Sequence, residues 1–85
     1  KETSLTENYS DLNIYPNPVE NELFIATEMN VEEIAIYDIY GRTVRQQVNK
    51  TTGKQVIDVA DLENGIYFIN IKTDNGNIVE RFVKK

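Results

Sequence analysis

The chain has 85 residues, of which 40% are hydrophobic and 27% charged, and this length and balance predict one small folded domain. Its net charge of −5 disfavours nucleic acid as a partner, and no apolar run approaches the ~20 residues of a membrane-spanning helix, so we expect no direct membrane insertion. Because cysteine and histidine are both missing, thiol nucleophiles, the usual zinc ligands and the commonest general base are excluded, and we expect neither an enzyme nor a bound cofactor.

The first ten residues, KETSLTENYS, are polar and lack periodicity. Such a segment is typical of a flexible linker. Because the chain begins at Lys1 instead of methionine, we expect it to be part of a longer polypeptide, with residues 1–10 joining an upstream domain. The folded domain is then predicted to occupy residues 11–85.

Two prolines flank Asn17 in the stretch NIYPNPVENELFI, between two short alternating apolar runs. Each proline fixes its own φ, removes a backbone donor and pushes the residue before it toward an extended conformation. We therefore predict that Tyr15 and Asn17 are extended and that strand pairing stops at Pro16. The result should be a stiff crossing instead of a tight hairpin, which sends the second strand to a different position, such as the opposite sheet.

Short apolar alternations separated by turn residues continue to the end of the chain. The runs lie near residues 12–14, 23–25, 34–36, 44–48, 57–59, 65–73 and 77–84. In GIYFINIKT, Tyr67, Ile69 and Ile71 share one face, and Asp74-Asn75-Gly76 after it is a hairpin turn signal. Seven short strands with this spacing predict an all-β domain, an antiparallel two-sheet β-sandwich of the immunoglobulin-like type. The pattern leaves the strand order open.

Two groups of side chains suggest binding sites and also have structural explanations. Asp58, Asp61 and Glu63 could form a calcium loop, but their spacing does not match the twelve-residue loop, and aspartate is a common turn former, which is the interpretation we favour. Six aromatic residues could line a sugar-binding face, although most aromatics in so small a sandwich are needed for its core. These six are Tyr15, Phe24, Tyr37, Tyr40, Tyr67 and Phe68.

Four stretches carry a family resemblance when they are taken together. They are YPNPVENELFI (residues 15–25), IYDIYGR (36–42), IDVADLENGIYFINIK (57–72) and RFVKK (81–85). Their order and spacing resemble the C-terminal sorting domain, type A, of the bacterial type IX secretion system, over residues 12–85. The resemblance implies a small β-sandwich at the C-terminus of a secreted cargo protein. The cargo would reach the periplasm by its own N-terminal signal.

The same resemblance implies partners and a destination. The domain would direct its fused upstream cargo through an outer-membrane secretion translocon with its shuttle proteins, and a sortase-like surface peptidase would then remove it. The cargo would end at the cell surface or be secreted. Two other hypotheses remain open from the residues alone: an immunoglobulin-like structural spacer and a carbohydrate-binding module.

The resemblance also assigns site residues by position. The signature turn falls on Pro16, Asn17 and Pro18, the further signature positions on Gly41, Gly65 and Tyr67, and translocon recognition on Phe82, Val83, Lys84 and Lys85. Where the family frequently has lysine, this chain has Arg81, which keeps the charge. We expect the last strand to bind its receptor by strand addition, with Lys84, Lys85 and the terminal carboxylate as polar anchors.

Overall fold

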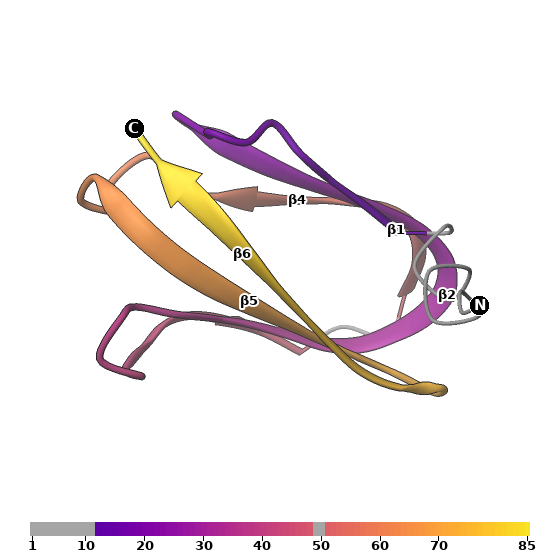
Figure 1. Ribbon diagram of the computed structural model, residues 1–85. Coiled ribbons are helices and arrows are strands. Elements are labelled where there is room, and N and C mark those ends of the chain that lie inside the picture. The colour runs from indigo at the N-terminus through magenta and orange to yellow at the C-terminus, as the bar shows by residue number, and fades with distance from the viewer. Residues whose placement is uncertain (1–11, 49–50) are drawn as a thin grey trace, which may run out of the picture.

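The computed structural model describes residues 12–48 and 51–85, so the expected linker at residues 1–10 lies outside the described residues. Six antiparallel strands make up the described part (Figure 1). They are β1 (Leu12–Tyr15), β2 (Glu22–Tyr37), β3 (Thr43–Gln47), β4 (Thr51–Asp58), β5 (Gly65–Thr73) and β6 (Gly76–Lys84). None of the described residues forms a helix that could cross a membrane.

The long strand β2 organises the sheet, because every other strand except β6 pairs with it. On one edge of β2, β4 pairs with the first half of the strand and β3 with the second half. On the opposite edge, β1 pairs with the first half and β5 with the second half. The ladders shift register around Val31, where β2 bends sharply (Figure 1). A break of this kind raises local twist and lets a strand turn a corner. The two halves of β2 therefore face each other.

The strand count corrects one expectation. The apolar runs at residues 23–25 and 34–36, which we expected to be separate strands, are two parts of the single strand β2. The polar segment TEMNVEE between them contains neither glycine nor proline, so nothing in its local chemistry ends the strand. The described part is thus one curled antiparallel sheet of six strands, and the immunoglobulin-like sandwich of two sheets and seven strands is not confirmed.

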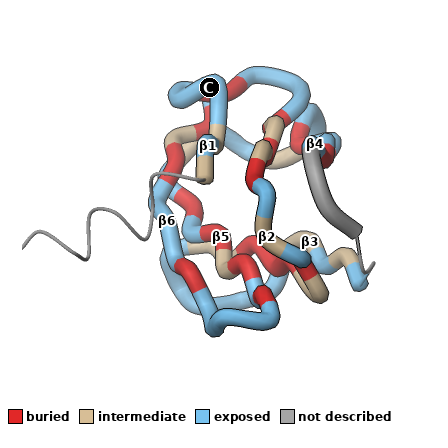
Figure 2. The backbone as a smooth tube through the Cα atoms, turned by 90° about the vertical axis from the view of Figure 1, so that its right-hand side faces the viewer, coloured by how far each residue is buried: buried red, intermediate tan, exposed pale blue. Residues whose placement is uncertain are grey.

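The core fills the inside of the curled sheet. Buried and exposed residues alternate along the strands (Figure 2), as the period of two in a strand requires. Tyr67, Ile69 and Ile71 share one face, as predicted, and that face points inward. The Tyr67 ring stacks on Phe82 at a centroid distance of 5.7 Å. The other buried members of the core cluster are Val19, Leu23, Ile25, Val31, Ile34, Ile36, Ile57 and Val59.

The proline segment ends β1 where the sequence predicts, at Tyr15, and both prolines follow cis peptide bonds. The predicted relocation of the second strand is wrong, because β2 returns beside β1 and pairs Phe24 with Tyr15. The loop of residues 16–21 is long enough to connect β1 and β2 while its middle contacts β6. Val19 forms a parallel bridge with Lys84, at the far edge of the sheet. The loop, and not the second strand, makes the crossing.

Candidate recognition site

The four predicted motifs meet at one end of the curled sheet, opposite the bend of β2 (Figure 1). The proline segment contacts the end of β6 through Val19. β5 begins beside the end of β6, because Gly65 pairs with Lys84. The turn between β2 and β3, which contains Gly41, borders the same groove as Gly65 and Tyr67. Segments far apart in the sequence therefore form one surface, which we call the signature end.

The proline segment covers the outer edge of the last strand. Val19 donates its amide hydrogen to the Val83 carbonyl and accepts one from the Lys85 amide, each at 2.8 Å. The side chain of Asn17 extends this pairing, because its Oδ1 accepts the Val83 amide hydrogen at 3.0 Å and its Nδ2 lies 3.5 Å from the Arg81 carbonyl. Residues 17–19 thus act as a short added strand. A receptor that adds a strand at residues 81–85 would have to displace them.

Alternation along β6 decides how much of the predicted recognition segment is accessible. Phe82 and Lys84 point inward and are only 1% and 5% exposed. Lys84 directs its Nζ to the Lys85 carbonyl at 3.1 Å. Val83 is half-buried on the outer face, and Lys85 is exposed. Of the four residues predicted to recognise the translocon, only Lys85 is exposed.

The turn that contains Gly41 is held by the carboxylate of Asp38. Its Oδ1 accepts the amide hydrogens of Tyr40 at 2.9 Å and Arg42 at 3.0 Å, and its Oδ2 accepts the Arg42 Nε hydrogen at 2.7 Å. Burial alone would raise the pKa of the Asp38 carboxyl, but these hydrogen bonds and the charge of Arg42 outweigh it and lower the pKa. Gly41 has a φ of 84°, a backbone shape that a side chain would strain. The turn is therefore well ordered.

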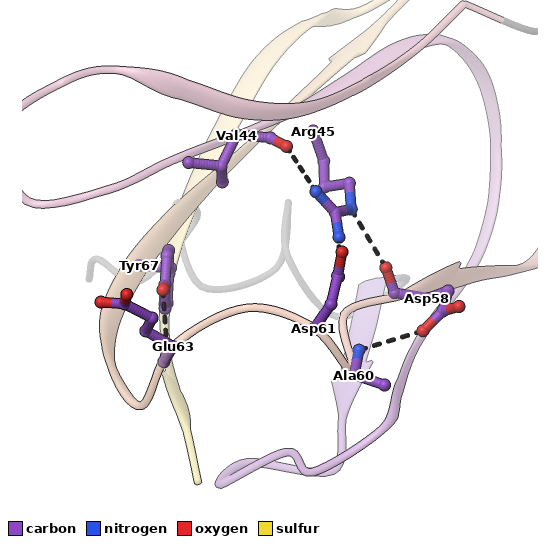
Figure 3. Close-up of polar contacts among 7 residues, drawn as sticks. All are labelled: Val44, Arg45, Asp58, Ala60, Asp61, Glu63 and Tyr67. Carbon is purple, nitrogen blue, oxygen red and sulfur yellow. Dashed lines mark hydrogen bonds and ion pairs between the residues drawn. The ribbon is translucent and has the colours of Figure 1, made fainter.

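A groove of about 360 Å³ separates this turn from the loop before β5. Its walls are Asp38, Ile39, Tyr40, Arg42, Val44 and the segment from Asp61 to Tyr67. Gly65 begins β5 with a φ of 154°, and Tyr67 donates its hydroxyl hydrogen to the Glu63 carbonyl at 2.7 Å (Figure 3). Burial, followed by the nearby charge of Glu63, raises the pKa of the Tyr67 phenol. Tyr67 is thus a core residue with a satisfied hydroxyl.

The acidic cluster is used in local contacts. Figure 3 shows Arg45 reaching from β3 to an ion pair with Asp61, while its Nε donates to the Asp58 carbonyl at 3.2 Å. The Asp58 side chain accepts the Ala60 amide hydrogen at 3.0 Å. These are contacts of turn formers. Within residues 12–48 and 51–85, no group of three or more acidic side chains is arranged to hold a metal ion.

The six aromatic residues lie in several places. Tyr15 stacks on Phe24 at 5.4 Å, with the Lys54 Nζ 4.8 Å from the Phe24 centroid, on the half of the sheet formed by β1, β2 and β4. Tyr37 pairs with Phe68 on the other half. Tyr67 is buried, and Tyr40 stands at the tip of its turn with 77% of its surface exposed. The aromatics do not form one row.

Sequence reasoning missed two residues that shape the signature end. Val19 is fully buried against the last strand, and its signal was its position as the single apolar residue in the polar loop PNPVEN. Asp38 precedes Gly41 by three residues, which is the spacing at which an aspartate side chain caps a turn. The contact of Val19 with the last strand could be found only in the folded structure, whereas the partners of Asp38 lie within its own turn.

Comparison with protein families places most of the chain in a known family. The model of the family described as secretion system C-terminal sorting domain matches residues 13–85. The matched region includes the proline segment, the turn at Gly41, the start of β5 and the whole of β6. No curated protein matches the chain.

Proposed function

Since the chain belongs to the secretion system C-terminal sorting domain family, the sorting signals of type IX secretion, we propose that it works as a folded recognition module for the outer-membrane translocon. Cargo with such a domain is exported across the outer membrane, to the cell surface or beyond it. The domain itself is not an enzyme in this proposal. Its attached upstream cargo supplies any activity.

The observation that carries the proposal is the family match over residues 13–85, together with the meeting of its motifs at one end of the sheet. A receptor that binds the signature end could contact the proline segment, the Gly41 turn and the last strand at once. Recognition by several segments that meet only in the folded state would tie export to correct folding. A structural spacer would have no need of such an arrangement.

Within this proposal, the end of β6 is the first recognition element and the proline segment the second. Asn17 and Val19 hold the backbone of residues 81–85 in place, so that Val83 faces outward and the exposed Lys85 extends beyond the strand. A fixed presentation lowers the conformational entropy lost on binding. Shuttle proteins and the translocon would bind this surface.

The route and fate of the cargo complete the proposal. The cargo reaches the periplasm through its own N-terminal signal, passes the translocon with this domain attached, and is then separated from it by a sortase-like surface peptidase. Membership of the sorting-domain family is what supports these three steps as parts of the proposal.

The test is export of a reporter. The 85-residue chain is fused behind a reporter that carries a periplasmic signal, in a bacterium with a type IX system, and the reporter outside the cell is measured. Export that disappears in a strain without the translocon supports the proposal. A reporter that stays in the periplasm of the wild-type strain refutes it and favours a spacer or a carbohydrate-binding module.

A further inference from the structure

Two large apolar residues are displayed at the tip of the turn between β2 and β3. Ile39 is 60% exposed and Tyr40 is 77% exposed. Chain reversals are ordinarily built from small and polar residues, which cost nothing when they face water. Neither side chain belongs to the core cluster, so packing within the domain does not explain them.

Hydrogen bonds hold the turn that displays these two side chains. Besides the three hydrogen bonds that the Asp38 carboxylate accepts, the Asp38 amide donates to the Arg42 carbonyl and the Gly41 amide donates to the Asp38 carbonyl, each at 3.0 Å. The guanidinium of Arg42 lies over the Tyr40 ring, 5.4 Å from its centroid, which favours one position of the ring. A preorganised tyrosine beside an arginine is the kind of pair that dominates binding energy at protein interfaces.

The adjoining groove has an apolar floor and a negative rim. Val44, Leu62 and Tyr67 contribute to its lining, and Ile66 stands at its margin with 42% of its surface exposed. The carboxylates of Asp38 and Asp61 are neutralised by Arg42 and Arg45.

Glu63, also in the lining, is exposed, and no ion pair among the described residues involves it. The groove therefore carries about one uncompensated negative charge, on a chain whose net charge is −5.

We propose that this groove and the Ile39–Tyr40 tip form a docking surface for a segment of the export machinery that offers a large apolar side chain next to a lysine or arginine. The apolar side chain fills the groove beside Tyr40, and its basic neighbour pairs with Glu63. The inference rests on the proposed function and specifies what the turn between β2 and β3 and its groove would bind. The last strand is then one part of a wider interface.

The experiment compares export of the reporter fusion with four single variants. Tyr40→Ser removes the displayed ring, and Glu63→Lys reverses the rim charge while leaving the backbone carbonyl that Tyr67 uses. Val48→Ser is the control for the first, since Val48 is 69% exposed outside the groove. Glu28→Lys is the control for the second, with the same charge change on an exposed position of β2. All four replace exposed residues, so each purified variant should keep its Tm within about 4 °C.

Tyr40→Ser and Glu63→Lys should lower the initial rate of export about tenfold or more, as expected when an interface loses a residue of this kind. The two controls should export at the wild-type rate. If Tyr40→Ser or Glu63→Lys exports as well as the wild type, the docking surface is refuted while the proposed function stands. If the wild-type fusion itself is not exported, the proposed function is what fails.

A second copy of the chain is the competing occupant. Sedimentation of the purified domain and of Tyr40→Ser distinguishes it: a dimer that Tyr40→Ser dissociates would overturn the inference. A monomer in both cases, together with the export defects, supports a basic segment of the machinery.

Discussion

The side chain of Asn17 offers a direct test of how the last strand is held. Asn17→Ala removes the acceptor for the Val83 amide at 3.0 Å and the weaker contact with the Arg81 carbonyl at 3.5 Å. The second contact is at the limit of a hydrogen bond and adds little. Because Asn17 is exposed, water replaces part of what is lost, and we expect a cost of ~1 kcal/mol. For a domain of this size that corresponds to a fall in Tm of about 4–8 °C.

Three measurements separate the local effect from the global one. Thermal unfolding gives the stability change, and amide hydrogen exchange should show lost protection at Val83, while the Lys85 amide, bonded to the Val19 carbonyl, keeps more of its protection. Export of the fusion reports on function. Asn17→Asp keeps the oxygen acceptor and should preserve the protection of Val83.

Ile71→Val serves as the stability-matched control. Ile71 is fully buried in β5 and lies away from the signature end, and loss of one methylene there costs ~0.5–1.5 kcal/mol. We expect Asn17→Ala to reduce export more than Ile71→Val at equal Tm. Equal export by the two variants, or unchanged protection at Val83, would show that Asn17 does not position the strand.

Three further predictions concern the rest of the signature end. Gly41→Ala places a side chain on a residue with a φ of 84° and should lower the free energy of unfolding, measured in urea, by ~1 kcal/mol. The new Cβ adds no steric clash, because no atom lies within 4 Å of it. An unchanged urea midpoint would argue against this turn geometry. The lowered pKa of Asp38 means that its carboxylate stabilises the fold fully only well above the unfolded pKa of about 4, and that this stabilisation is lost as the pH falls through the pKa of the folded state. The Tm difference between the wild type and Asp38→Asn should therefore shrink between about pH 5 and pH 2, and a constant difference would contradict the assigned contacts. Tyr67→Phe should lower the free energy of unfolding by ~1 kcal/mol, because the hydrogen bond to the Glu63 carbonyl is lost. Since the pKa of Tyr67 is raised in the folded state, the wild type should lose stability as the pH rises beyond about 10, and the variant should lose less. Thermal unfolding in alkaline buffers measures this difference.

Features that depend on neighbouring residues were predictable from the sequence. The inward face of β5 follows from alternation in GIYFINIKT, and Asp74-Asn75-Gly76 closes the hairpin to β6 as its turn chemistry indicates. The end of β1 at Tyr15 follows from the missing donor of Pro16. Most of GIYFINIKT and the proline segment also carried the family resemblance, so these motifs could be identified before any contact was known.

Features that depend on residues distant along the chain were decided only by the tertiary structure. Nothing local marks TEMNVEE as a bend instead of a strand break, because the bend is set by what packs inside it. The burial of Lys84 arises from its place between Gly65 on one side and Val19 on the other, whereas lysines near a chain end ordinarily face water. The bond from Val83 to Asn17 joins residues 66 apart. The sequence by itself determined the alternating apolar runs, the turns and the inventory of motifs, since φ/ψ preferences and alternation act over a few residues. The curled sheet determined which motif covers which edge, because such contacts exist only once the two halves of β2 face each other.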